Sequence, residues 1–120
     1  MQDYRKLRVW QQAHRLALKT YTVTPHLAKP EGWALREQVL RSAISIPSNI
    51  AEGTGQGSDP EFARFLWYSM GSCNELESQL LLGHDLNFIP SEMHAALAGD
   101  IADVRKMLSG LIGTVKQHPN

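Results

Sequence analysis

The chain has 120 residues, 42% of them hydrophobic and 20% charged, and its twelve Lys and Arg side chains balance twelve carboxylates. This composition is typical of a globular protein and excludes a disordered chain of low hydrophobicity. No run approaches the roughly 18 apolar residues of a membrane span, so we expect a cytoplasmic protein without a membrane partner. The length predicts a single domain over residues 1–120.

The first predicted element is an amphipathic helix over about residues 5–28. Apolar residues recur at spacings of three and four from Leu7 to Leu27, which is the period of a helix. Pro30 and Gly32 then interrupt the pattern, because proline cannot continue a helix and glycine is a poor helix former.

The second predicted helix covers about residues 33–53 and contains a proline in its interior. An interior proline costs a helix roughly 3 kcal/mol or more, yet the apolar stripe keeps its phase through Pro47. We therefore predict one long helix that is kinked at Pro47. Ser45 is well placed to satisfy backbone groups that the bend frees.

Two further helices follow, over about residues 59–87 and 91–113, with a tail at 114–120. In "GTGQGSDPEF", Asp59 can cap the third helix and Pro60 suits its first turn. No strand pattern competes with the helical periodicity. Because the connections are short, we predict an all-α fold: an antiparallel, up-and-down four-helix bundle.

The sequence contains no recognisable catalytic motif. No Asp or Glu is followed three residues later by His, which argues against a di-metal site in the bundle. The loop "GTGQG" lacks the Lys and Ser/Thr of a phosphate-binding loop. Cys73 lies on the predicted core face, where a structural thiol is the expected reading. We expect no catalytic residue, metal or cofactor, and an enzyme is the least favoured class.

Apolar residues on the back of the third helix predict contact between subunits. Trp67 points roughly 160° away from the centre of the core stripe, and Met70 and Leu81 lie on the same outward side. Tryptophan is enriched at interface hot spots, so we expect Trp67 to be buried between subunits.

The polar face of the second helix is a further candidate interface. It consists of Arg41, Ser45, Ser48, Asn49 and Glu52. Either these residues meet another subunit, or they face water and Arg41 pairs with Glu37 one turn away.

A basic stripe on the first helix is the candidate nucleic-acid site. Arg5, Arg8, Arg15 and Lys19 fall within about 80° of one another at 100° per residue. Such a stripe binds either the phosphates of RNA or DNA or an acidic helix of the same chain. The absence of exposed aromatic residues interleaved with the stripe argues against base stacking.

The stretch "SIPSNIAEG" at residues 45–53, with "EFARFL" and "ELESQL" further on, resembles the four-helix-bundle family of ribosomal RNA intervening-sequence proteins. The resemblance covers about residues 4–112. It implies a bacterial cytoplasmic protein that assembles into a ring-shaped homopentamer. A related branch, the accessory variability determinant of diversity-generating retroelements, is a basic pentamer that binds nucleic acid and a reverse transcriptase. This sequence departs from the family pattern, because Gln56 and Gly57 stand where many relatives place arginines.

These observations favour a non-enzymatic oligomeric scaffold or adaptor. Its expected partner is itself, as a homopentamer, and a second, unidentified protein is an alternative partner. The competing hypothesis is a sequence-nonspecific RNA-binding protein that acts through the basic stripe. The net charge of zero makes nucleic-acid binding less favoured than in the basic branch.

Overall fold

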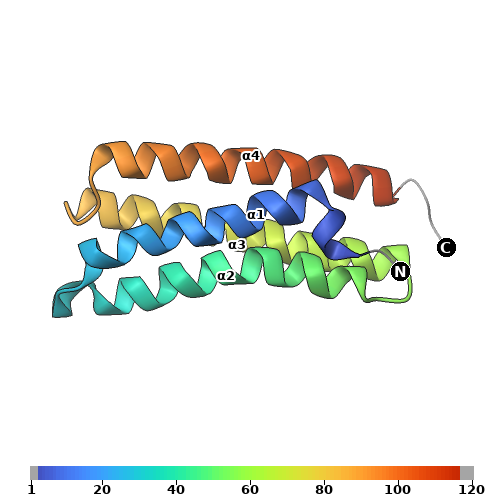
Figure 1. Cartoon of the computed structure of the whole chain (residues 1–120), viewed down its shortest axis with the longest axis horizontal. Helices are drawn as coiled ribbons and strands as arrows, with labels where there is room; N and C mark the ends of the chain where they lie inside the picture. Colours follow the sequence, from blue (N-terminus) through green and yellow to red (C-terminus); the bar gives the residue numbers. More distant parts are fainter. Residues whose placement is uncertain (1–2, 117–120) are drawn as a thin grey trace.

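A computed structural model describes residues 3–116. Within this range, four antiparallel helices lie side by side in a bundle and no strand is present (Figure 1). The helices are α1 (Arg8–Thr20), α2 (Trp33–Thr54), α3 (Asp59–Asp85) and α4 (Ser91–Lys116). The start of α1 and the end of α4 lie at the same end of the bundle, which is the expected result of up-and-down connections. The predicted fold class is confirmed.

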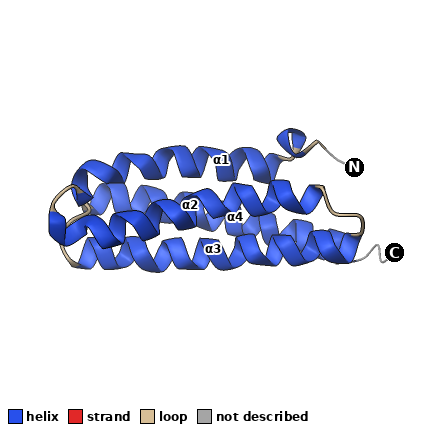
Figure 2. Cartoon of the chain, turned by 90° about the horizontal axis from the view of Figure 1, so that it is seen from below, coloured by secondary structure: helices blue, strands red, loops and turns tan. Residues whose placement is uncertain are grey.

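The four helices occupy the corners of a square. The main packing partners of α1 are α2 and α4, and those of α3 are the same two helices. Figure 2 shows α1 and α3 on opposite sides of the bundle, with α2 and α4 between them. The bundle measures 49 × 21 × 20 Å between its extreme Cα positions. Surfaces on α1 and on α3 therefore face in different directions and are accessible at the same time.

Large apolar side chains from all four helices fill the interior. Leu16, Ile46, Leu66 and Leu108 are among those that are almost fully buried. Each such side chain contributes roughly 1.5–3 kcal/mol when it is removed from water, so the shared interior stabilises the arrangement of the helices. No helix among the described residues is both long and apolar enough to cross a membrane.

The first helical segment differs from its prediction. The α-helix runs only from Arg8 to Thr20, with a 3₁₀ turn before it (η1, Tyr4–Lys6) and a 3₁₀ helix after it (η2, Tyr21–Leu27). A single α-helix over residues 5–28 is therefore wrong. Pro25 lies inside η2 and has no N–H to offer the carbonyl four residues earlier, so the tighter 3₁₀ winding replaces the α-helix there. A third 3₁₀ turn, η3 (Pro30–Gly32), leads into α2.

Helix α2 continues through Pro47 without a break, as predicted. Side chains next to the proline bond to the backbone around it. The Ser48 hydroxyl donates to the Ile44 carbonyl at 2.8 Å, and the Asn49 amide donates to the Ser45 carbonyl at 2.8 Å. Proline at position 47 leaves the Ala43 carbonyl without its backbone donor, so these bonds support the neighbouring turns rather than replace the missing bond. The bend angle at Pro47 stays a prediction.

Helix α3 supplies two further polar contacts to this part of α2. The buried Ser69 hydroxyl donates to the Ile46 carbonyl at 2.7 Å. The Ser45 hydroxyl lies 3.0 Å from the Ser42 carbonyl oxygen and 2.5 Å from Ser72 Oγ. Because Ser45 and Ser72 are partly and largely buried, their contact links α2 to α3 inside the bundle. Ser45 therefore contributes to the packing of α2 against α3, and its predicted role in satisfying backbone groups freed at Pro47 stays a prediction.

The start of α3 is capped by a different residue from the one predicted. Ser58, rather than Asp59, is the N-cap, and its hydroxyl accepts from the Glu61 backbone N–H at 3.4 Å. Asp59 and Pro60 are the first two residues of the helix. Both carboxylates in this first turn lie near the positive end of the helix dipole, where they stabilise the helix.

Candidate interaction site

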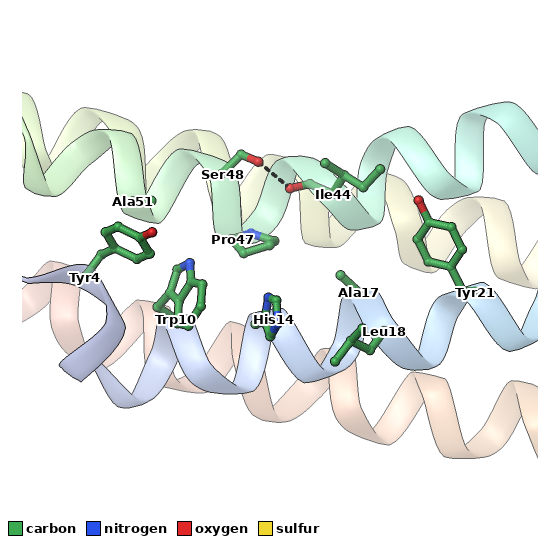
Figure 3. A pocket seen from close by; sticks show the side chains of 10 residues that line it. All are labelled: Tyr4, Trp10, His14, Ala17, Leu18, Tyr21, Ile44, Pro47, Ser48 and Ala51. Carbon is green, nitrogen blue, oxygen red and sulfur yellow. Dashed lines mark hydrogen bonds between the residues drawn. The ribbon is translucent and has the colours of Figure 1, made fainter.

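A groove runs along the outside of the bundle between α1 and α2. Its cavity has a volume of about 440 Å³, and Figure 3 labels the ten residues that line it. The α1 side presents aromatic and apolar groups, and the α2 side presents Ile44, Pro47, Ser48 and Ala51. The Ser48 hydroxyl is already bonded to the Ile44 carbonyl, so the α2 wall is mainly apolar in character.

Three rings form a continuous row along the α1 side of this groove. The Tyr4 and Trp10 rings meet edge to face with centroids 5.0 Å apart, and the Trp10 and His14 rings stack at 4.8 Å. Tyr21 extends the row at the other end and is 48% exposed. Aromatic rings held against one another lose little conformational freedom when a partner binds, so the groove is preorganised for contact.

The outer face of α3 is a second apolar surface. We define it by four exposed residues in two pairs. Trp67 and Tyr68 lie near the start of α3, and Leu81 and Leu82 lie about 20 Å further along it, with exposed polar residues such as Asn74 and Ser78 between the pairs. Trp67 is 50% exposed and Leu81 is 48% exposed. Met70, which the sequence grouped with them, is half-buried and packs against the core.

A cavity of about 470 Å³ lies at the start of this α3 face and reaches α4. Trp67, Tyr68 and Arg64 line it from α3, and Val115 lines it from α4. Arg64 donates to the Tyr68 hydroxyl at 2.6 Å and to Glu61 at 2.7 Å, so its guanidinium is fixed against the Tyr68 ring. This surface therefore lies on the α3/α4 side, opposite the groove between α1 and α2.

The polar residues predicted as an interface on α2 do not form one continuous surface. Ser45 is engaged with Ser72, and the partly buried Asn49 bonds to the backbone of its own helix. Arg41 and Glu52 are exposed, and Ser48 belongs to the groove. The structure contains no ion pair between Arg41 and Glu37 among the residues it describes.

The predicted basic stripe lies on the opposite flank of α1 from the aromatic row. Arg8 and Arg15 line a polar cleft of about 430 Å³ together with Asp103 and Lys106 of α4. Lys19 donates to Asp100 of α4 at 3.0 Å, so one member of the stripe is paired within the bundle.

Arg5 is not part of the helical stripe, because it belongs to the preceding 3₁₀ turn. Its guanidinium donates to both carboxylate oxygens of Asp3, at 3.1 and 3.2 Å. This hydrogen bonding lowers the pKa of Asp3 below its ordinary value. The predicted grouping of Arg5 with Arg8, Arg15 and Lys19 on one helix face is therefore wrong, since 100° per residue does not apply across the turn.

Helix α3 is joined to α4 by an ion pair. Arg105 donates to Glu77 through two nitrogens, each at 3.0 Å, and to the Asn74 side chain at 2.9 Å. These hydrogen bonds lower the pKa of Glu77 and raise that of Arg105. One carboxylate of α3 is thus neutralised by an arginine of the neighbouring α4.

The only cysteine is buried on the inner side of α3. Burial raises the pKa of Cys73 to about 12, so the thiol stays protonated at neutral pH. Within residues 3–116, no group of three or more His, Cys, Asp or Glu side chains could hold a metal ion. The candidate interaction sites of the described residues are therefore the groove between α1 and α2 and the outer face of α3.

The groove could not be found from the sequence, because Trp10, Ala17 and Tyr21 follow the helical period beside the buried stripe and would be expected to extend it. The helical period places these residues toward α2 correctly, but α2 presents short side chains there, notably Pro47 and Ala51. The space above the α1 rings is consequently left open. The aromatic residues of this segment therefore lie in the groove and not among the basic residues of the stripe.

Comparison with known proteins shows the family of the chain and supports its fold. The 23S rRNA-intervening sequence protein family matches residues 5–110. A crystal structure of a protein of unknown function from the S23 ribosomal protein family, from Bacteroides thetaiotaomicron VPI-5482, is similar with a TM-score of 0.81 and 25% identity. The similarity covers 87% of this chain and 97% of that one. No curated protein matches the sequence. Because the family match spans most of the chain, the protein belongs to the 23S rRNA-intervening sequence protein family.

Proposed function

We propose that the protein is a non-enzymatic scaffold that functions as a homo-oligomer. The observation that carries the proposal is the exposure of apolar side chains on two opposite sides of a bundle whose core is already complete. Scattered apolar residues are normal on a protein surface, but grouped ones that line a groove are typical of interaction sites. The proposal takes the pentamer implied by the family resemblance as the expected assembly.

The mass of the protein in solution tests this proposal. Light scattering after size exclusion should give a multiple of the 13.4 kDa chain mass, five for a pentamer. Trp67→Asp should give a folded, smaller species, since a charge at a desolvated anchor weakens an interface strongly. Ala102→Asp is the matched control, because Ala102 is exposed on α4 and belongs to neither apolar surface. A wild-type mass of one chain at micromolar concentration would overturn the proposal.

Sequence-nonspecific RNA binding is the second candidate. The observation in its favour is the α1–α4 cleft, where Arg8, Arg15 and Lys106 meet one carboxylate, Asp103. Repeated around an oligomer, three cations per chain neutralise many phosphates, and affinity then falls steeply with salt. Against it, the aromatic row lies on the other flank of α1, so stacking and charge do not act together.

Titration of labelled structured RNA at low and at physiological salt tests this candidate. Binding at low salt that Arg8→Glu with Arg15→Glu abolishes would support the role. Absence of binding at low salt, or binding that the double variant leaves unchanged, would exclude this cleft as an RNA site.

A further inference from the structure

We propose that the groove between α1 and α2 of one copy receives the outer face of α3 of a second copy. This inference rests on the proposed homo-oligomer and specifies how its subunits are joined. The contact is heterologous, meaning that two different surfaces meet, so every subunit donates one surface and accepts another. Heterologous contacts generate closed rings or filaments rather than isolated dimers.

The two surfaces differ in shape, although the α3 face has its own cavity beside Trp67. The groove is concave, with a cavity of about 440 Å³ whose walls come from two helices. The α3 face is carried by one helix, and its apolar groups, including Trp67 and Leu82, project from it. A single helix seated between two others is the arrangement that packs ridges into grooves.

The positions of the surfaces allow one subunit to use both. Helices α1 and α3 lie on opposite sides of the bundle, so a partner in the groove does not obstruct a partner on α3 (Figure 2). A long side of the bundle, 49 by 21 Å, covers roughly 1,000 Å². That area is enough for a standard interface, which takes about 800 Å² from each partner.

Charge favours this pairing over contacts between identical surfaces. Residues 4–27, which form the α1 side of the groove, carry five Lys and Arg side chains and no carboxylate. Helix α3 carries five carboxylates and a single arginine. Arg8, Arg15 and Lys19 lie on the flank of α1 that faces α4 and not in the groove itself, so their charge acts on an approaching partner over a distance. Groove against groove would bring two cationic helices near each other, and α3 against α3 would bring two acidic helices together. Groove against α3 brings opposite charges together.

This charge difference is only partly cancelled within one chain. Among the described residues, no salt bridge joins the 4–27 segment to α3, but Arg5 pairs with Asp3, Lys19 with Asp100 and Glu77 with Arg105. Glu75 on α3 and Lys6 in the 4–27 segment form no salt bridge in this part of the chain. The charges that are left contribute to the orientation of two approaching copies.

Complementary variants test the pairing. Ile44→Glu places a carboxylate in the groove and leaves α3 intact, whereas Trp67→Asp alters α3 and leaves the groove intact. Both sites are about half exposed, and circular dichroism verifies that each variant is folded. Each variant alone should be monomeric, with affinity lowered at least about 30-fold, as expected for a hot spot. Mixed in equal amounts, they should form a complex of two chains and no larger species, because one intact groove then meets one intact α3 face.

Other outcomes overturn the inference in distinguishable ways. A Trp67→Asp protein that dimerises alone would show that grooves join to grooves, and an Ile44→Glu dimer would show that α3 joins to α3. A mixture that stays monomeric would show that the two surfaces are not partners. Leu18→Glu and Leu82→Glu repeat the test if the first pair is poorly folded. A monomeric wild-type protein would instead refute the proposed oligomer itself.

Discussion

Substitution of Gly53 by alanine should destabilise the bundle, although alanine favours helix formation. Gly53 is buried near the end of α2, and an added Cβ would lie 2.9 Å from Phe62 Cδ1 and 2.9 Å from Phe65 Cβ. The Cβ of Phe65 is attached directly to the backbone, so α2 and α3 must separate slightly. Overpacking of this kind costs typically 1–3 kcal/mol. The gain in helix propensity is at most about 1 kcal/mol and is smaller near a helix end.

The net loss in the free energy of unfolding should be about 1–2 kcal/mol. Urea unfolding followed by circular dichroism measures it, and with a slope of about 2 kcal/mol/M the midpoint should fall by roughly 0.5–1 M. All variants are compared at one protein concentration, since assembly contributes to the measured stability.

Gly99→Ala is the matched control. Gly99 lies inside α4, is exposed, and has no neighbouring atom within 4 Å of an added Cβ. This variant should be more stable than the wild type by roughly 0.8–1 kcal/mol, which is the propensity difference alone. A Gly53→Ala protein that matches or exceeds the wild type would show that the α2–α3 contact is looser than the structure indicates, and would refute the reasoning.

Three further predictions concern the interior and the ion pairs. Because burial raises the pKa of Cys73 to about 12, the thiol should react with a thiol reagent at pH 8 only after denaturant is added; rapid labelling of the native protein would contradict this. Arg105→Gln should lower stability at pH 7 by at most about 1 kcal/mol, since the pair is largely exposed. The pKa of Glu77 is lowered in the folded state, so the ion pair stabilises the protein at pH values above the ordinary pKa of 4.5. This contribution is lost as the pH falls through the lowered pKa, and the free energies of unfolding of the wild type and the variant should then converge. Ser72→Ala should cost about 1 kcal/mol in urea unfolding by removing the partner of Ser45, and an unchanged midpoint would show that this contact contributes nothing.

The sequence predicted the last three helices closely. The expected ranges 33–53, 59–87 and 91–113 compare with Trp33–Thr54, Asp59–Asp85 and Ser91–Lys116. These segments have strong apolar periodicity and clear interruptions between them. The first segment was overextended because Val23 and Leu27 keep the apolar pattern in a 3₁₀ helix, where they remain buried. Periodicity reports which residues face the core, whereas Pro25 determines which hydrogen bonds the backbone makes there.

The candidate surfaces were predicted less completely. The exposure of Trp67 and Leu81 followed from the phase of a single helix, because the core stripe of α3 is well defined. The partners of Ser45 and Lys19 depend on which helix lies beside them, and the apolar periodicity of a single helix does not show which helix that is. The groove depends on a mismatch in size between two helices. Its existence follows only when the large α1 rings are placed opposite the short α2 residues.

Pro47 connects the unusual sequence of α2 with this groove. An interior proline sacrifices roughly 3 kcal/mol of helix stability, a large fraction of the 5–15 kcal/mol that holds a typical domain together. The side-chain bonds from Ser48 and Asn49 to nearby carbonyls offset part of that cost. An alanine at position 47 would continue the helix with a smaller loss of helix stability. What proline adds is a rigid apolar ring with no N–H donor, and it lies in the α2 wall opposite Trp10 and His14. The contribution of Pro47 is therefore best explained by the surface it shapes rather than by the helix that contains it.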